Sequence, residues 1–305
     1  MAIIEKSISS NADGLKLGIT IVTPAKNHKV KGIVQLVHGM SEHRKRYLPF
    51  MKFLAKKGYV SIINDHRGHG DSILNDADLG YFYDNHAEYI VEDVHQVTEL
   101  IKADYPDKEV ILFGHSMGSL VVRNYIQKYD DEISKLIVCG SPSNSHETLI
   151  GLLLVNILEK VKGPKYRSIF VHKLAFKNYS SHFKEKSINS WVSSSEDEVS
   201  KYDKDKKCGF IFTLNGFKNL FKLLRNTYKS NRYQMKNRDL AILFISGADD
   251  PVMIDEEHFY EACDFLKNLG YKVQHILYKD KRHDLLNEDI KDIVYQDIVE
   301  FIEEK

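Results

Sequence analysis

The chain has 305 residues, of which 43% are apolar, enough for one large hydrophobic core with or without an insertion. Its 43 basic and 43 acidic side chains balance, so the strongly basic character typical of nucleic-acid-binding proteins is excluded and we expect no nucleic acid partner. The three cysteines lie far apart without the paired spacing of a zinc or redox motif, which favours a reducing compartment.

No targeting or membrane-spanning segment is expected. Residues 1–6 show no basic region followed by an apolar stretch, so we expect no signal peptide and a cytoplasmic location. The longest apolar run, Leu149–Leu158, has ten residues and includes Gly151 and Asn156. It is about half the length needed to cross a bilayer.

Short apolar runs alternate with segments of helical periodicity along most of the chain. This alternation predicts an α/β fold, with a mostly parallel sheet flanked by helices. Strands buried on both faces of such a sheet are near-continuous apolar runs. The predicted strands are residues 32–37, 59–63, 109–113, 135–139, 241–246 and 272–278.

Apolar residues at helical spacing predict helices over about 90–101, 259–269 and 290–301. Asn85 and Glu88 are placed as a capping pair for the first of these helices. Gly270 follows the second helix as a C-terminal stop signal.

The alternation is interrupted between about 145 and 230. This stretch has no clear strand pattern and contains two apolar clusters, Leu149–Leu158 and Phe210–Leu224. It has 16 Lys and Arg against 8 Asp and Glu, so its net charge is +8 and that of the remainder is −8. We therefore predict that residues 145–230 form an inserted helical lid on a core made of residues 1–144 and 231–305.

Residues 114–118 read Gly-His-Ser-Met-Gly, a G-x-S-x-G sequence. It follows the predicted strand 109–113 and precedes an apolar-periodic segment, 120–129. In a strand-to-helix turn of this kind the glycines permit a sharp bend, and the serine hydroxyl is exposed above the sheet. The alternative is a serine that only caps a helix. The context favours Ser116 as a nucleophile.

A serine hydroxyl is a poor nucleophile unless a base removes its proton and a carboxylate orients that base. Proteins with this turn supply these groups in the chain order Ser, acid, His. Two downstream loops fit this order, one with Asp249 and Asp250 and one with His283. Both follow predicted strands, where the catalytic groups of open α/β sheets gather. We expect a catalytic triad.

The oxyanion of a tetrahedral intermediate needs hydrogen-bond donors. The backbone N–H after the nucleophile, on Met117, is the first, and the second is expected in the loop after an early strand. His38-Gly39-Met40 follows the strand that ends at Val37, which makes the Met40 N–H the natural second donor. Both residues would act through their backbone.

Other polar residues receive structural interpretations. His66 and His69 are three apart, a spacing that can indicate a metal site, but no third ligand is evident and the neighbouring glycines favour a tight hydrogen-bonded turn. Cys139 is interpreted as a small buried residue at a strand end. Glu196–Glu198 are interpreted as a solvated helix start and Arg44–Arg46 as surface charge. We predict no metal ligand.

Several segments together resemble the monoacylglycerol lipase and lysophospholipase group of α/β-hydrolases, which overlaps the serine aminopeptidase-like hydrolases. The similarity runs from about Gly32 to the C-terminus. Its motifs are HGxxEHxxRY at 38–47, DxRGxGxS at 65–72, GHSMG at 114–118, G-x-x-D at 247–250 and the segment with the catalytic histidine at 283–288. The first and third of these are fairly specific.

The resemblance implies an α/β-hydrolase fold with Ser116 as nucleophile, Asp250 as acid and His283 as base. Asp250 is implied in place of Asp249 because it is the fourth residue of G-x-x-D. The resemblance also implies the backbone N–H groups of Met40 and Met117 as oxyanion donors. Met40 departs from the small residue common at that place in monoacylglycerol lipases, which leaves the substrate open.

The predicted function is a serine hydrolase that cleaves carboxylic esters with one acyl chain, such as a monoacylglycerol or a lysophospholipid, without a cofactor. An aminopeptidase would need carboxylates in the lid to hold a charged amine, whereas the lid is net basic with one acidic cluster at 196–198. A non-catalytic binding module is a further alternative, in which the triad would have decayed. The basic, partly apolar lid also suggests peripheral contact with an anionic membrane. The oligomeric state is left open.

Overall fold

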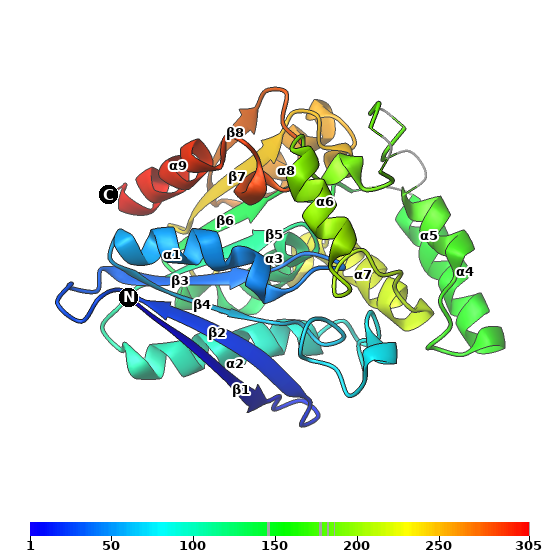
Figure 1. The fold of residues 1–305 in the computed structure, drawn as a ribbon, viewed down its shortest axis with the longest axis horizontal. Coiled ribbons are helices and arrows are strands. Elements are labelled where there is room, and N and C mark those ends of the chain that lie inside the picture. The colour runs from blue at the N-terminus through cyan, green and yellow to red at the C-terminus, as the bar shows by residue number, and fades with distance from the viewer. Residues whose placement is uncertain (145–146, 177–178, 182, 186, 305) are drawn as a thin grey trace.

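The computed structural model describes residues 1–144, 147–176, 179–181, 183–185 and 187–304. The described residues form one eight-stranded sheet with the strand order β1-β2-β4-β3-β5-β6-β7-β8 (Figure 1). β1 and β2 run antiparallel to their neighbours, and the strands from β4 to β8 are parallel. The strands are β1 Ala2–Ser9, β2 Lys16–Thr23, β3 Gly32–Val37, β4 Tyr59–Asn64, β5 Val110–His115, β6 Lys135–Cys139, β7 Ala241–Gly247 and β8 Lys272–Tyr278.

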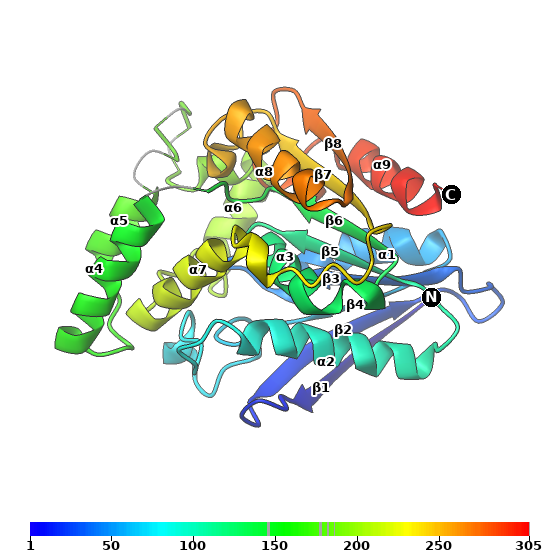
Figure 2. The ribbon, with the colours of Figure 1, turned by 180° about the vertical axis from the view of Figure 1, so that it is seen from behind.

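Helices cover both faces of the sheet (Figures 1 and 2). They are α1 Leu48–Lys56, α2 Tyr89–Asp104, α3 Met117–Tyr129, α4 Glu147–Lys162, α5 Ile169–Phe176, α6 Glu196–Lys204, α7 Leu214–Thr227, α8 Glu256–Leu269 and α9 Lys291–Glu303. One apolar core lies between the sheet and α1 and α9, the other between the sheet and α2, α3 and α8. Side chains of a strand alternate between the two cores, as Ile33 and Val34 of β3 do.

The six predicted strands are confirmed, with ends that differ by at most two residues. β1 and β2 were not predicted. They form an antiparallel hairpin at the edge of the sheet, and β1 is largely exposed, so neither core imposes an apolar run on it. β8, at the opposite edge, is only partly buried. Burial on both faces therefore holds for the inner strands only.

The predicted helices correspond to α2, α8 and α9. Gly270 ends α8 in a left-handed conformation at φ 113°, as its stop signal predicts. The predicted capping pair of α2 is wrong. Glu88 precedes the helix but makes no capping hydrogen bond through its side chain, and the Asn85 side chain instead accepts hydrogen bonds from Asn215 and Lys218 of α7.

Between β6 and β7 the described residues form α4 to α7 and no strand. α4 and α5 lie outermost, at one end of the molecule (Figures 1 and 2). The cluster Phe210–Leu224 packs largely into the core beneath α2 and α3, whereas Leu149–Leu158 exposes much of its apolar surface. That residues 145–230 form a separate lid domain stays a prediction, and its first two residues lie outside the described ranges.

No helix in the described part of the chain is long and apolar enough to span a membrane.

Candidate active site

Ser116 lies in a sharp turn between β5 and α3. Its backbone has φ 54° and ψ −121°, a strained conformation for a residue with a side chain. Gly114 and Gly118 are required for close approach: a Cβ on Gly118 would lie 2.1 Å from the Val37 carbonyl oxygen, and one on Gly114 would lie 2.5 Å from the Gly118 carbonyl oxygen. The structure therefore contains the strand-to-helix turn that the G-x-S-x-G sequence predicts.

His283 and Asp250 come together at the ends of β8 and β7. The Nδ1 of His283 lies 2.8 Å from Asp250 Oδ2, and both side chains are buried. Asp250 Oδ1 accepts a hydrogen bond from the Val252 N–H at 2.9 Å. Asp249 is exposed and points its backbone N–H to the Lys281 carbonyl. Because His283 Nδ1 is hydrogen-bonded to Asp250, Nε2 is the ring nitrogen that remains free to accept or donate a proton.

The loop after β3 passes directly beside Ser116. A Cβ on Gly39 would lie 2.9 Å from the Ser116 Cβ, so the next residue, Met40, is placed near Ser116 as the sequence predicts. Met117 is buried and begins α3. The loop that carries Met40 and the start of α3 thus meet at Ser116, and the role of the two N–H groups as oxyanion donors stays a prediction.

Three buried histidines support this loop. His38 Nδ1 contacts the Gly39 carbonyl at 2.8 Å, and His38 Nε2 accepts the His66 N–H at 3.0 Å. His69 Nε2 accepts the Ser41 N–H at 3.3 Å. Burial, and then the charge of a neighbouring histidine, lowers the pKa of His38 and of His69 to about 3. Both rings are therefore neutral and keep an acceptor nitrogen for the loop.

Glu42 connects the parts of the site, and sequence reasoning did not predict this role. Its Oε1 accepts hydrogen bonds from the Gly39 N–H at 2.6 Å and the Tyr47 hydroxyl at 2.9 Å, and it contacts His115 Nδ1 at 3.1 Å. His115 Nε2 lies 3.2 Å from the His283 carbonyl oxygen. One carboxylate thus joins the loop after β3 to the Ser116 turn and, through His115, to the His283 loop.

The charges in this network favour its ionised form. Burial alone would raise the pKa of the Glu42 carboxyl, but the hydrogen bond and charge of His115, with the charge of Arg46, hold it well below its ordinary value. Burial would lower the pKa of His115, but the contact with Glu42 raises it. Arg46 donates to Glu42 at 3.2 Å and pairs with Asp284.

The interpretation of Arg44–Arg46 as surface charge is wrong for two of the three residues. Arg46 belongs to the Glu42 network, and Arg44 is buried, where it pairs with Asp65 and with Glu5 of β1. Only Lys45 is exposed. A charged run in a sequence does not reveal carboxylates that reach it from distant strands and loops.

The structure agrees with the interpretations of residues 65–72 as a turn, of Cys139 as a buried residue and of Glu196 as a helix start. Gly68 and Gly70 have positive φ, and a Cβ on Gly70 would lie 2.2 Å from the Asp65 carboxylate, so residues 65–72 form the tight turn predicted. Cys139 is fully buried at the end of β6. Glu196 begins α6 behind the capping residue Ser195, and Glu196 and Asp197 are exposed.

Residues of the predicted lid contact the His283 loop. The Trp191 and His283 rings lie 5.1 Å apart, centroid to centroid, and the Asp284 N–H donates to the Val192 carbonyl at 2.7 Å. A cavity of about 640 Å³ opens beside this loop, not over Ser116. Polar residues line it apart from Val199, with serines, three carboxylates and three basic side chains, among them Glu185, Asp203 and Arg282.

A family model described as serine aminopeptidase, S33, matches residues 28–290. The chain belongs to this family of α/β-hydrolases. A monoacylglycerol lipase from Mycolicibacterium smegmatis is 30% identical to this S33 family member over 164 residues, 53% of this chain and 54% of that protein. The human monoglyceride lipase is 32% identical over 111 residues, 36% of this chain and 34% of that protein. The alignments thus span about a third to a half of these curated relatives.

Solved structures resemble the S33 family member over its whole length. A thermostable carboxyl esterase from Bacillus coagulans, in complex with glycerol, has a TM-score of 0.91 and 27% identity, covering 99% of this chain and 98% of the other. A soluble variant of the Saccharomyces cerevisiae monoglyceride lipase, in complex with a substrate analog, has a TM-score of 0.75 and 19% identity, covering 99% and 96%. The second likeness shows the fold alone.

Proposed function

We propose that this protein is a serine hydrolase that cleaves carboxylic esters through an acyl-enzyme. The observation that carries the proposal is the pairing of buried His283 and Asp250, in which the His283 carbonyl lies 3.2 Å from Nε2 of His115, the residue before the strained Ser116 turn. Membership of an α/β-hydrolase family and the carboxyl esterase with a TM-score of 0.91 support it.

In the proposed reaction Ser116 attacks the ester carbonyl while His283 Nε2 accepts the hydroxyl proton. Asp250 keeps the other ring nitrogen protonated and stabilises the imidazolium. The oxyanion accepts hydrogen bonds from the N–H groups of Met40 and Met117. His283 then protonates the leaving alcohol, and a water activated by the same nitrogen releases the acid and restores the Ser116 hydroxyl.

The proposed substrate is an ester with one acyl chain, such as a monoacylglycerol or a lysophospholipid. The names of the monoacylglycerol and monoglyceride lipases among the relatives support this class, as does the glycerol in the esterase complex. The test is labelling by a fluorophosphonate probe, followed by a hydrolysis screen of monoacylglycerols, lysophospholipids and short p-nitrophenyl esters. Absence of labelling at Ser116 would contradict the serine mechanism and favour a non-catalytic binding module.

Aminopeptidase activity is the second candidate, because a proline iminopeptidase from Pestalotiopsis fici is 31% identical over 110 residues and carboxylates line the cavity beside His283. Glu185 is paired with Arg282 at 2.6 Å, and Asp203 accepts hydrogen bonds from Ser187 and Asn189. These two carboxylates already have partners, which favours the esterase. Turnover of aminoacyl anilides above that of p-nitrophenyl esters would reverse this choice.

Peripheral contact with an anionic membrane belongs to the same proposal. On α4 the side chains of Ile150, Leu153, Ile157 and Val161 are 62–73% exposed at helical spacing, and Ile169 and Phe170 of α5 are exposed as well. Exposed Lys160, Lys162 and Lys173 lie on the same two helices. A basic surface with apolar side chains favours binding to anionic lipid. The test is sedimentation with phosphatidylglycerol vesicles against neutral ones at two salt concentrations.

A further inference from the structure

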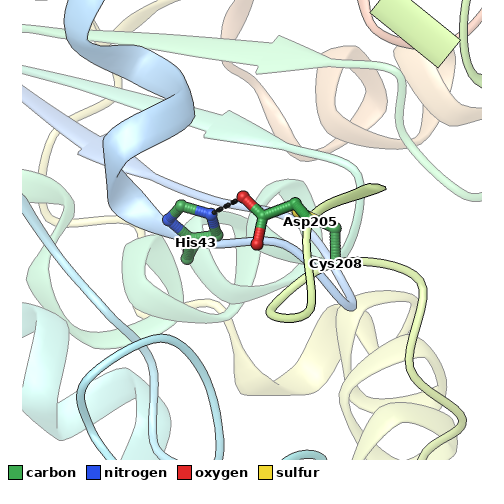
Figure 3. Close-up of side chains that lie close together, drawn as sticks. All are labelled: His43, Asp205 and Cys208. Atoms are coloured by element: carbon green, nitrogen blue, oxygen red, sulfur yellow. Dashed lines mark hydrogen bonds and ion pairs between the residues drawn. The ribbon is translucent and has the colours of Figure 1, made fainter. Parts of the chain in front are cut away.

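His43, Asp205 and Cys208 bring three ligand-type atoms together outside the proposed catalytic site (Figure 3). Nε2 of His43, a carboxylate oxygen of Asp205 and Sγ of Cys208 all lie within 4.8 Å of one another, and the His43 and Asp205 atoms are 2.9 Å apart. His43 comes from the loop after β3, and the other two residues come from the turn after α6. The sequence gives no metal-binding signal here because these segments are far apart in the chain.

The turn after α6 prearranges its two ligands. The Cys208 N–H donates to the Asp205 carbonyl at 2.9 Å, and the Lys207 N–H donates to Asp205 Oδ1 at 2.8 Å. This hydrogen-bonded turn leaves Oδ2 directed at His43. Two ligands separated by two residues is the spacing that many zinc sites use within one turn.

Burial and charge at the cluster fit a divalent cation. His43 and Cys208 are 8% exposed, whereas the Asp205 side chain is 39% exposed and leaves a path from solvent. Cys208 would bind such an ion as its thiolate, because a thiol that coordinates a metal is deprotonated. The nearby Arg46 is already paired with Glu42 and Asp284 and leaves the Asp205 carboxylate and the Cys208 thiolate to balance a 2+ ion.

We propose that His43, Asp205 and Cys208 bind one zinc ion, with water as the fourth ligand. The nitrogen, oxygen and sulfur set suits Zn²⁺ and does not suit Mg²⁺ or Ca²⁺, which take oxygen ligands. Zinc bonds of about 2.0–2.3 Å put tetrahedral ligand atoms roughly 3.3–3.8 Å apart. A side-chain adjustment of about 1 Å therefore closes the site. On binding, the proton that His43 Nε2 shares with Asp205 shifts to Nδ1, so that the free Nε2 coordinates the ion, and Cys208 releases its thiol proton to solvent.

Zinc at this site would connect the predicted lid to the loop that carries Met40, two segments that hydrogen bonds already join. The Gly209 N–H donates to the Ser41 carbonyl at 2.9 Å, and the Ser41 hydroxyl donates to the Phe210 carbonyl at 2.7 Å. The Tyr202 hydroxyl also donates to the Ser41 carbonyl, at 3.0 Å. His43 lies two residues after Ser41. A zinc ion bound by His43, Asp205 and Cys208 would therefore hold the same two segments together and raise the stability of the folded chain.

The test is titration of the full, untagged chain with Co²⁺ and Zn²⁺. We expect one equivalent of Co²⁺ to produce a thiolate-to-cobalt charge-transfer band in the near ultraviolet, and Zn²⁺ to displace it. We also expect zinc at 100 times its Kd to raise the Tm by about 5 °C. Cys208→Ser should abolish the band and weaken zinc binding more than about 10-fold. Cys263→Ser, at a buried cysteine of α8, is the matched control and should keep both.

Two further variants separate ligation from loss of folding. Asp205→Asn changes a partly exposed side chain and should weaken zinc binding while the cobalt–thiolate band persists. His258→Gln removes a surface histidine that pairs with Asp255, and it should leave the stoichiometry at one. The proposal is overturned if the native chain gives no cobalt–thiolate band. It is overturned equally if Cys208→Ser and Asp205→Asn, both folded by circular dichroism, bind zinc like the native chain.

Discussion

Replacing Asp250 with Asn would reverse one hydrogen bond without changing the size of the side chain. Asp250 Oδ1 accepts the Val252 N–H at 2.9 Å, so the amide has to keep its carbonyl oxygen there. Its NH₂ group then faces His283 Nδ1, where Asp250 Oδ2 now lies at 2.8 Å. Because two donors cannot face each other, the imidazole moves its proton from Nδ1 to Nε2. An Nε2 that carries a proton cannot accept the one from Ser116.

The expected loss in kcat is on the order of 10⁴, the scale seen when a triad loses its orienting carboxylate. At about 1.36 kcal/mol per tenfold, this is about 5.4 kcal/mol of transition-state stabilisation. Asp249→Asn is the matched control, because its exposed side chain precedes Asp250 directly. A surface substitution of this kind changes energies by about 0.5 kcal/mol, so its kcat should stay within roughly 2-fold.

The assay is the hydrolysis of a soluble p-nitrophenyl ester at saturating substrate, with thermal unfolding of each variant measured in parallel. Similar Tm values would show that the Asp250→Asn variant is folded. Retention of more than about a tenth of kcat in that variant would refute the reasoning. A loss confined to Asp249→Asn would move the acid by one residue.

Three other outcomes follow from the site and its surroundings. Ser116→Ala should abolish fluorophosphonate labelling and lower kcat on the order of 10⁶-fold; labelling at another serine would contradict the assignment. Glu42→Gln should lower the free energy of unfolding by about 3–5 kcal/mol, because it removes one partner of a buried charged network. Because folding lowers the pKa of Glu42, this residue stabilises the folded state at pH values above its ordinary pKa of 4.5. Because folding raises the pKa of His115, that residue stabilises the folded state at pH values below its ordinary pKa of 6.5. The wild-type advantage over Glu42→Gln in pH-dependent melts should therefore be largest between these values and shrink on either side. Ile150→Lys with Ile157→Lys should reduce binding to phosphatidylglycerol vesicles while turnover of a soluble ester is kept; unchanged sedimentation would contradict membrane contact through α4.

The inner strands could be predicted because burial on both faces leaves a continuous apolar run, as in Gly32–Val37 and Lys135–Cys139. β1 could not, because it is an exposed edge strand with charged residues such as Glu5 and Lys6; β2 is buried from Leu17 to Val22 and carries the apolar signal, but it was not predicted. The strand conformation of β1 is fixed by backbone pairing with β2. That pairing leaves little trace in hydrophobicity.

The site shows the same division between local and distant signals. Ser116 could be placed from its flanking glycines, since the sharp turn is a property of a few consecutive residues. The part played by Glu42 depends on His115 and on the Gly39 N–H, which meet only when β3 and β5 pair. No pattern within one segment reports such a contact. The choice of Asp250 over Asp249 came from the resemblance to a motif, and the structure brings Asp250 to His283.

The glycines beside Ser116 divide this region into positions that can and cannot change. At Gly39 and Gly118 any side chain would collide with Ser116 or with the backbone of β3, so a saturation library should recover glycine almost alone there. Met40, next to Gly39, is not restricted in this way. Its side chain is half-buried, and every residue except proline can supply its backbone N–H. Substrate preference could therefore be redesigned, or drift in evolution, through the side chain at position 40 while the proposed hydrogen bond to the oxyanion stays in place.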